Sequence, residues 1–148
     1  MEILLVIDIQ QRYMKNYDDD LLTRVNRRIH SAVKQDVPVV YVRNMGKLEA
    51  AERYDFAPNL DIVTDVIFDK SLPSAFSSTE FVDYIKRLGV EEISIIGVDG
   101  RCCVPRTAMD AVNNGYKTRL YLDAVAARSD KFYSKELEEM KEAGVIVE

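Results

Sequence analysis

Short apolar runs alternate along the chain with longer segments in which apolar residues recur at every third or fourth position. The runs are rich in Val and Ile and predict strands at residues 3–7, 37–42, 66–68, 93–96, 118–122 and 145–147. The first four are almost continuously apolar, which is typical of strands covered on both faces. The periodic segments predict helices over residues 21–33, 78–88, 103–114 and 133–143.

This alternation of strands and helices predicts an α/β fold with a mostly parallel sheet of six strands. We expect helices on both faces, in the three-layer, doubly wound arrangement of Rossmann-like folds, within a single domain over residues 1–148. In such sheets ligands bind beyond the carboxyl ends of the strands. The residues that follow the strands are therefore site candidates: Asp8 to Gln10, Arg43 and Asn44, Asp69 and Lys70, Gly97 to Asp99 with the cysteines behind them, and Asp123.

Three of these positions carry groups that can act in catalysis, and each has an ordinary structural explanation as well. Asp8 is as readily a carboxylate that caps a loop, and a lysine such as Lys70 is usually solvated. A cysteine at the start of the helix over residues 103–114 lies at the positive end of the helix dipole. That position favours the thiolate and lowers the pKa of the thiol. A free cysteine is more often a small buried apolar residue, so the pattern alone leaves both readings open.

The chain has one histidine, His30, which lies inside the first predicted helix and away from the strand ends. Ser-His-Asp and Cys-His mechanisms need a histidine at the site, so neither is expected. One histidine and two adjacent cysteines also cannot form the usual tetrahedral zinc site, so we expect no metal. A nucleophilic cysteine must then find its base in a carboxylate, for which Asp8 is the candidate.

Charge and composition limit the partners and the location. The 148 residues carry a net charge of -5, which argues weakly against nucleic acid and anionic membranes as partners. No apolar stretch reaches the roughly 18 residues of a transmembrane helix, and the N-terminus lacks the basic region of a signal peptide. We expect a cytoplasmic protein that binds a small molecule. Cys102 and Cys103 are adjacent, so no structural disulfide is expected between them.

Three motifs follow one another in chain order at the strand ends. The first, D-x-Q-x-x-F/Y, is matched by Asp8, Gln10 and Tyr13. The second, K-x-x-x-S-A-F, is matched by Lys70 and Ser74-Ala75-Phe76. The third, G-V-x-T-x-x-C-V-x-x-T-A-x-D-A-x-x-x-G-Y, is matched by Gly97, Val98, Cys103, Val104, Thr107, Ala108, Asp110, Ala111, Gly115 and Tyr116. Together they span nearly the whole chain, which resembles the isochorismatase-like hydrolases, a family that includes isochorismatases, N-carbamoyl amidohydrolases and nicotinamidases.

The resemblance implies a catalytic trio. Cys103 rather than Cys102 is the expected nucleophile, because only Cys103 keeps the family spacing to Gly97 and Val98. Asp8 is the expected general base, and Lys70 is the cation that holds the thiolate and orients the pair. The implied chemistry is attack on a carbonyl or vinyl ether carbon, followed by hydrolysis of the covalent intermediate. Cys103 is accordingly expected to be the thiol that iodoacetamide labels first.

The resemblance also implies the surroundings of the trio. The backbone N–H groups of Asp99 and Cys103 are the expected oxyanion hole, and the peptide bond between Val98 and Asp99 is expected to be cis. Residues of the first and second motifs, together with the residue before that bond, are expected to line the substrate pocket: Gln10, Tyr13, Phe76 and Val98. No cofactor is implied.

The chain departs from the family pattern in three respects. Gly100 stands where the family has threonine in the third motif. Residues 43–56 contain no histidine, which argues against the metal set that nicotinamidases carry after the second strand. The chain is also short for the family, so we expect a homodimer or higher homo-oligomer in which a partner subunit completes the pocket.

These observations favour a metal-free cysteine hydrolase that acts on a small amide or a related compound. The alternative is a catalytically weakened family member that serves as a binding or assembly module, for which Gly100 and the short chain leave room. A third hypothesis is a redox-responsive protein that uses the adjacent Cys102 and Cys103.

Overall fold

The computed structural model describes residues 1–46, 54–131 and 133–148. This part of the chain contains a parallel sheet with the strand order β3-β2-β1-β4-β5-β6. The strands are β1 (Glu2–Ile7), β2 (Val39–Asn44), β3 (Ile67–Lys70), β4 (Glu92–Val98), β5 (Lys117–Ala126) and β6 (Ile146–Val147). The order reverses between β1 and β4, and the carboxyl ends of these two strands therefore form the switch point at which doubly wound sheets bind ligands.

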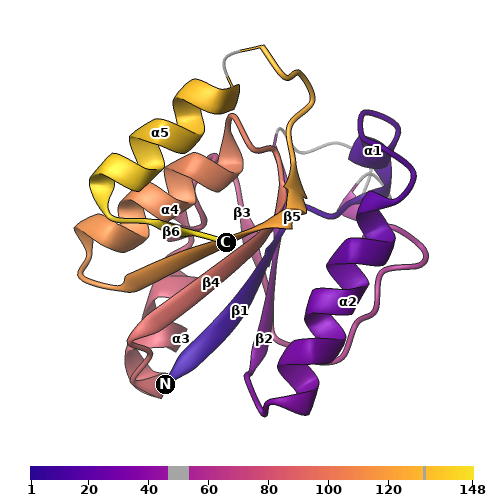
Figure 1. Cartoon of the computed structure of the whole chain (residues 1–148). Coiled ribbons are helices and arrows are strands. Elements are labelled where there is room, and N and C mark those ends of the chain that lie inside the picture. Colours follow the sequence, from indigo (N-terminus) through magenta and orange to yellow (C-terminus); the bar gives the residue numbers. More distant parts are fainter. Residues whose placement is uncertain (47–53, 132) are drawn as a thin grey trace.

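Helices cover both faces of the sheet, which gives the three-layer α/β/α arrangement (Figure 1). The helices are α1 (Gln11–Met14), α2 (Leu21–Lys34), the 3₁₀ turn η2 (Ala75–Ser77), α3 (Thr79–Leu88), α4 (Cys103–Asn113) and α5 (Tyr133–Ala143). Helix α2 packs on one face, whereas α3, α4 and α5 pack on the other. The six-stranded parallel sheet and the α/β fold class predicted from the sequence are thus confirmed.

Alternation of side chains along β1 divides the interior into two cores. Ile3, Leu5 and Ile7 point to the core shared with α3, α4 and α5, while Leu4 and Val6 point to the core beneath α2. Both sets are almost completely buried, which explains the continuous apolar run in the sequence.

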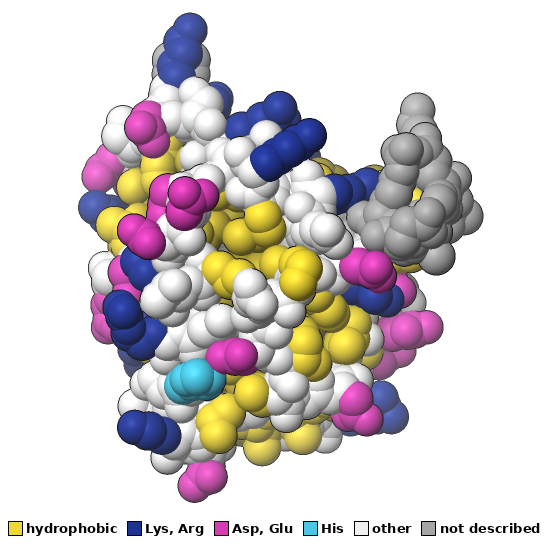
Figure 2. Space-filling model, turned by 90° about the vertical axis from the view of Figure 1, so that its right-hand side faces the viewer, with side chains coloured by type: hydrophobic (Ala, Val, Ile, Leu, Met, Phe, Trp, Pro, Cys, Tyr) yellow, Lys and Arg dark blue, Asp and Glu magenta, His cyan; other side chains and the backbone are white. Residues whose placement is uncertain are grey.

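Helix α2 illustrates how the sequence pattern orients an element. The apolar residues Leu21, Val25 and Ile29 recur every four positions and are buried against the sheet. The opposite side of the helix carries exposed polar side chains, among them Arg27 and His30, and lies on the face shown in Figure 2. None of the helices in the described ranges is both long and apolar enough to traverse a bilayer.

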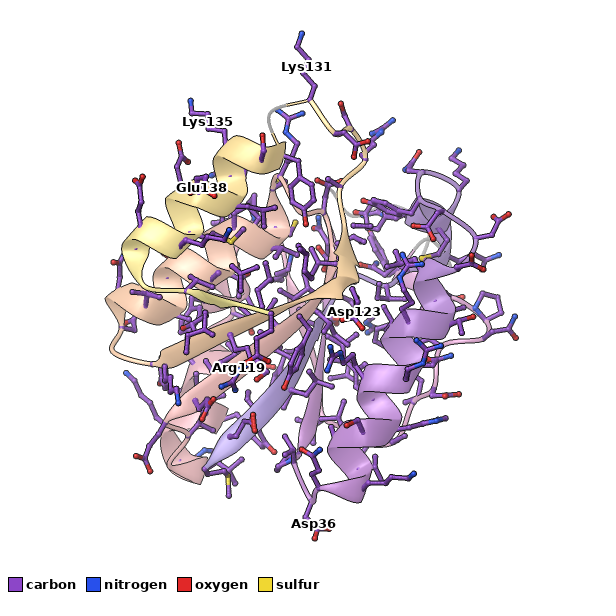
Figure 3. All side chains as sticks on the ribbon, viewed as in Figure 1. Asp36, Arg119, Asp123, Lys131, Lys135 and Glu138 are labelled. Atoms are coloured by element: carbon purple, nitrogen blue, oxygen red, sulfur yellow. The ribbon has the colours of Figure 1, made fainter. Side chains whose placement is uncertain are left out.

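A charged cluster lies at the opposite end of the sheet from the switch point. Arg119 of β5, which is labelled in Figure 3, pairs with Glu92 of β4, with Glu2 of β1 at 3.7 Å and with Glu148 at 3.3 Å. Glu2 and Glu92 open their strands, so this cluster ties the amino ends of β1 and β4 to β5. The cluster does not involve the carboxyl ends of these strands, where the ligand site is expected.

In the described part of the chain, the short elements α1 and η2 were not predicted from the sequence. Each is too short to show a helical period. Strand β5 is longer than predicted, because a register shift against β4 between Ile95 and Gly97 lets pairing resume at Val125 and Ala126. Residues 44–65, over which the sequence predicts neither a strand nor a helix, fall partly outside the described residues. Their described part includes an isolated bridge between Phe56 and Gln10.

Candidate active site

The ends of β1 and β3 and the start of α4 bring three side chains together. The ammonium group of Lys70 donates to Asp8 Oδ2 over 3.0 Å and lies 3.6 Å from Cys103 Sγ. The side chains of Lys70 and Asp8 are 0% and 2% exposed, and Cys103 is buried as well. Residues separated by up to 95 positions in the chain, Asp8 to Cys103, thus form one buried cluster at the switch point.

Local backbone geometry explains why Asp8 turns toward this cluster. Asp8 has a φ of 55°, in the left-handed region that aspartate tolerates better than most residues. Its N–H still pairs with the Val42 carbonyl, so the chain leaves the sheet only after Asp8. Beside it, a Cβ on Gly97 would lie 2.1 Å from the Ile7 carbonyl oxygen, so only glycine lets β4 approach β1 this closely. The glycine of the third motif therefore positions the two strands on which the cluster is built.

Burial dominates the electrostatics of the cluster. Desolvation raises the pKa of the Asp8 carboxyl above its ordinary value, and the Lys70 ammonium partly offsets this effect. Desolvation also raises the pKa of the Cys103 thiol, and the Asp8 charge adds to the rise while Lys70 opposes it. The lowered pKa expected for a cysteine at a helix N-terminus is therefore wrong for Cys103. Burial and the Asp8 charge therefore favour the neutral thiol form of Cys103.

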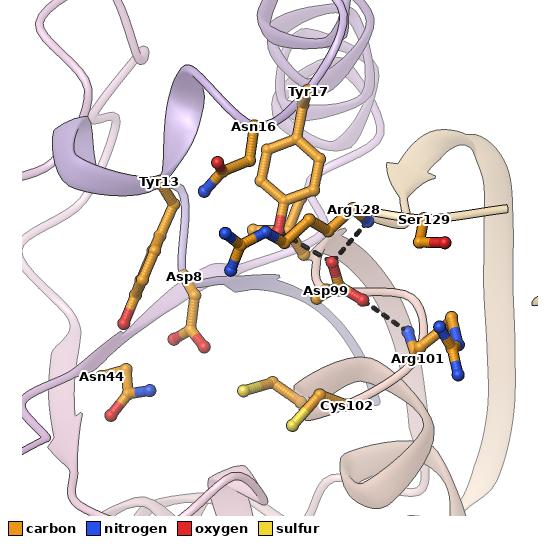
Figure 4. A pocket seen from close by; sticks show the side chains of 12 residues that line it. Asp8, Tyr13, Asn16, Tyr17, Asn44, Asp99, Arg101, Cys102, Arg128 and Ser129 are labelled. Carbon is orange, nitrogen blue, oxygen red and sulfur yellow. Dashed lines mark hydrogen bonds between the residues drawn. The ribbon is translucent and has the colours of Figure 1, made fainter. Parts of the chain in front are cut away.

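A cavity of about 540 Å³ opens above this cluster (Figure 4). Its lining comes from the ends of β1, β2, β4 and β5 and from the loop between α1 and α2: Asp8, Tyr13, Asn16, Tyr17, Asn44, Val98, Asp99, Arg101, Cys102, Cys103, Arg128 and Ser129. Of the pocket candidates named from the sequence, Tyr13 and Val98 line this cavity. Phenol, amide and guanidinium groups make it suited to a small polar molecule.

The other two pocket candidates, Gln10 and Phe76, do not line the cavity. The Gln10 side chain donates to the carbonyl groups of Asn44 and Tyr54 and accepts from the Asn44 N–H, so it ties the end of β2 to β1. The ring of Phe76 packs against Phe81, with ring centroids 5.5 Å apart. Both motif residues therefore have a structural role, because their side chains contact other parts of the protein and not the cavity.

Sequence reasoning missed five of the twelve residues that line the cavity, namely Asn16, Tyr17, Arg101, Arg128 and Ser129. Asn16 and Tyr17 lie in the turn between α1 and α2, a segment without a period to read. Arg128 and Ser129 follow β5, but the strand was expected to end at residue 122 and the rule of inspecting strand ends pointed to Asp123. Asp123 instead binds Arg28 over 3.0 Å, away from the cavity. Asn44 was found by that rule.

The loop before α4 carries two features that bear on the sequence expectations. The peptide bond between Val98 and Asp99 is cis, as expected. Within the described residues, the backbone N–H groups of Asp99 and Cys103 donate to no other protein group, whereas the neighbouring N–H of Gly100 pairs with the Ala126 carbonyl. Two donors therefore remain available near the thiol.

Gly100 faces the ring of Tyr133, the first residue of α5. A Cβ at residue 100 would lie 2.8 Å from Tyr133 Cε1 and 3.1 Å from its hydroxyl oxygen. That hydroxyl is buried without a partner among the described residues, and burial raises the pKa of Tyr133 to about 12. The tyrosine thus fills the space in which a side chain on residue 100 would lie.

Gly100→Thr is therefore expected to lower the free energy of unfolding by about 1–3 kcal/mol, because the added side chain overlaps the Tyr133 ring. In a Tyr133→Ala background the same substitution should have little effect, since the ring is gone. In a Tyr133→Phe background, which keeps the ring, the full loss should remain. Urea unfolding of the proteins with and without Gly100→Thr, in the native, Tyr133→Ala and Tyr133→Phe backgrounds, measures this. An effect of Gly100→Thr that is the same in all three backgrounds would refute the steric explanation.

The described residues contain no evident metal-binding set. In the described ranges, no three His, Cys, Asp or Glu side chains are grouped so that they could hold one. His30 lies on α2, pairs with Asp61 over 2.6 Å and is not among the residues that line the cavity.

Comparison with known proteins identifies the family to which the chain is similar. The model of the isochorismatase domain matches residues 2–148. The nicotinamidase/pyrazinamidase of Mycobacterium tuberculosis is 35% identical over 101 residues, which cover 62% of this chain and 54% of that protein. The pyrazinamidase of Pyrococcus horikoshii, solved in complex with zinc, is 26% identical with a TM-score of 0.81, covering 99% of this chain and 98% of that one. The N-carbamoylsarcosine amidase of Thermoplasma acidophilum shares the fold, with a TM-score of 0.84 at 20% identity over 99% and 95% of the two chains.

Proposed function

Because the chain belongs to the isochorismatase family, we propose that it is a hydrolase in which Cys103 attacks the carbonyl carbon of a small amide. The observation that carries this proposal is the position of the Lys70 ammonium, 3.0 Å from Asp8 Oδ2 and 3.6 Å from Cys103 Sγ at the base of the cavity. The cluster contains a nucleophile, a base and a cation to orient them, which is the set that covalent catalysis by cysteine needs.

Asp8 is the proposed general base. Its Oδ1 has no hydrogen-bond partner among the described residues, while Oδ2 is held by Lys70. The raised pKa of Asp8 makes it a stronger proton acceptor than an ordinary carboxylate, and the raised pKa of Cys103 keeps the resting sulfur as a thiol. The proton then moves from Cys103 to Asp8 as the sulfur bonds to the substrate carbon. Lys70 balances the negative charge throughout.

The reaction divides into two halves around a thioester. In the first, sulfur adds to the carbonyl carbon, the oxygen takes the negative charge, and collapse expels the amine, which leaves with the proton from Asp8. In the second, Asp8 takes a proton from water, the resulting hydroxide displaces the Cys103 sulfur, and the thiol is restored as the acid departs. The free N–H groups of Asp99 and Cys103 are the proposed donors to the oxygen in both halves.

We also propose that the reaction needs no metal. Support comes from the donor set, since no three His, Cys, Asp or Glu side chains are grouped among the described residues and the one histidine pairs with Asp61 from α2. The zinc in the Pyrococcus pyrazinamidase is a property of that protein. Prior incubation with a chelator should therefore leave the hydrolysis rate unchanged in the assay below.

The proposal is tested by ammonia release from nicotinamide, pyrazinamide and N-carbamoylsarcosine, the compounds on which the similar proteins are named to act. Reactions quenched in acid during turnover should contain protein that carries the acyl group, and peptide mapping should place that group on Cys103. The Cys103→Ala variant is the control, which should neither release ammonia nor gain mass. An acyl group on another residue, or turnover by the alanine variant, would contradict the mechanism.

The pH dependence of kcat/KM should have an acid limb set by Asp8. Burial raises the pKa of Asp8 above its ordinary value of 3.8, and only the ionised carboxylate can accept the thiol proton. Activity is therefore expected to fall as the pH drops through this raised pKa and to return as the pH rises. A profile of kcat/KM against pH measures the midpoint, and an acid limb at or below 3.8 would contradict this role of Asp8.

A further inference from the structure

We propose that the carboxylate of Asp99 is a positioning residue that holds three loops in place around the cavity. The proposal rests on the function given above and extends it, because it identifies the group that fixes the walls against which a substrate would bind. Asp99 follows β4 directly, at the switch point of the sheet, and lines the cavity itself.

Each oxygen of the Asp99 carboxylate accepts hydrogen bonds from a different part of the chain (Figure 4). Oδ1 accepts from the N–H of Arg101 over 2.8 Å, within the loop that leads to α4. Oδ2 accepts from the N–H of Arg128 over 2.6 Å, in the loop after β5, and from the Tyr17 hydroxyl over 3.0 Å, in the turn before α2. One side chain therefore joins three cavity walls that lie up to 111 residues apart, Tyr17 to Arg128.

The backbone of the same residue fixes the start of α4. The Asp99 carbonyl accepts from the N–H groups of Cys102 and Val104, both over 3.1 Å. These two bonds flank Cys103, so its sulfur is held in register with the residue that anchors the walls. Asp99 thus couples the position of the proposed nucleophile to the shape of the cavity.

The donors around this side chain require a carboxylate. Three hydrogen-bond donors converge on two oxygens, and both oxygens of an ionised aspartate are acceptors. An asparagine has the same shape but only one oxygen, so its NH₂ group must face either the Arg101 N–H or the Arg128 N–H. Whichever way the amide turns, two donors oppose each other and one loop loses its anchor.

The two parts of the cavity wall that contain Tyr17 and Arg128 are held by the contacts to Asp99 Oδ2. The Arg128 side chain reaches over the cavity toward Asp8 in Figure 4, and the Tyr17 ring stands beside it. In the described part of the chain the Arg128 guanidinium is in no ion pair, and the backbone of Arg128 is held by the bond from its N–H to Asp99 Oδ2. Loss of that bond would loosen the wall without changing the Asp8–Lys70–Cys103 contacts.

Hydrogen exchange followed by NMR tests the anchor without any substrate. In Asp99→Asn, the Arg101 or the Arg128 amide is expected to exchange roughly tenfold faster or more than in the native protein, while the amides of β1 and β4 keep their rates. Asp123→Asn is the matched control, since Asp123 binds Arg28 outside the cavity and its loss should leave both loop amides unchanged. Unchanged exchange in Asp99→Asn overturns the proposal. An equal increase throughout β1 and β4 also overturns it, because that result indicates general destabilisation.

Kinetics on a hydrolysed amide separate positioning from a purely structural role. Asp99→Asn is expected to raise KM roughly tenfold and to lower kcat less than roughly threefold, because the walls loosen while the cluster stays intact. Tyr17→Phe, which removes one donor and keeps the fold, should raise KM by less than Asp99→Asn does. Equal losses in kcat and kcat/KM contradict the anchor. If no amide is hydrolysed, the proposed function fails while the exchange result still decides this inference.

Discussion

Replacement of Lys70 by methionine is expected to lower the free energy of unfolding at neutral pH by about 3–5 kcal/mol. Methionine keeps the length of the side chain but removes the ammonium group, which leaves the Asp8 carboxylate buried without its partner. The Asp8 side chain is 2% exposed, so water cannot replace the lost interaction. Urea unfolding monitored by circular dichroism gives the free energy directly.

The double variant Asp8→Asn, Lys70→Met should recover most of that loss. With both charges gone, no buried ion lacks a partner, and neutral groups of similar size occupy the same space. The two single substitutions are therefore expected to be strongly non-additive, with the double variant more stable than either single one. Additive losses would show that the pair does not interact as the geometry indicates.

The pH dependence of the Lys70→Met effect has a definite sign. Burial holds the folded pKa of Asp8 above the ordinary value of 3.8, so folding takes up a proton between those two values. The contribution of Asp8 to stability is thus greatest below 3.8 and is lost as the pH rises through the folded pKa. Without Lys70 the folded pKa of Asp8 rises further. The loss caused by Lys70→Met should therefore be larger at about pH 8 than at about pH 5.

An exposed ion pair on the same two strands provides the matched control. Arg43 of β2 and Asp69 of β3 are joined over 2.8 Å, but their side chains are 28% and 43% exposed. Asp69 directly precedes Lys70, so the backbone environment is nearly the same. Arg43→Met is expected to change the free energy of unfolding by less than about 1 kcal/mol. A loss as large as that for Lys70→Met would mean that burial is not the cause.

The carboxyl ends of the strands could be predicted from the sequence because buried parallel strands are continuously apolar. Asp8, Lys70 and the loop before Cys103 were found as the polar residues that end such runs, and the structure brings their side chains together. This step depends only on local pattern and on the rule for doubly wound sheets. It does not need the family resemblance, which supplied the roles.

The parts that could not be predicted depend on contacts between distant segments. Arg128 lines the cavity because a register shift moves the end of β5 beyond residue 122, and no local pattern marks that shift. Gln10 fits the motif as well as Asp8 does, yet its side chain binds the backbone of Asn44. The pKa of Cys103 was predicted from the helix N-terminus, whereas burial and the Asp8 charge decide it. Assembly as a homodimer or larger oligomer and a cytoplasmic location stay predictions.

The same burial changes the expected order of thiol labelling. Cys103 is 7% exposed and its pKa is raised, while Cys102 is exposed at the cavity wall. Iodoacetamide reacts with accessible thiolates, so access favours Cys102 and the expectation that Cys103 is labelled first is withdrawn. The order of labelling therefore cannot identify the nucleophile. The hydrolysis rates of variants at each cysteine can distinguish the two residues.

Cys103→Ser is expected to lower kcat/KM by roughly 10⁴-fold or more, whereas Cys102→Ser should lower it by less than roughly threefold. A serine hydroxyl is far less acidic than a thiol and is a poorer nucleophile beside a carboxylate base, so Asp8 cannot activate it as it activates Cys103. Cys102 only lines the cavity wall, and serine keeps its size. Rates of ammonia release measure both variants, and urea unfolding should show them equally stable to within about 1 kcal/mol. If Cys102→Ser loses activity as completely as Cys103→Ser, the assignment of Cys103 as the nucleophile is contradicted.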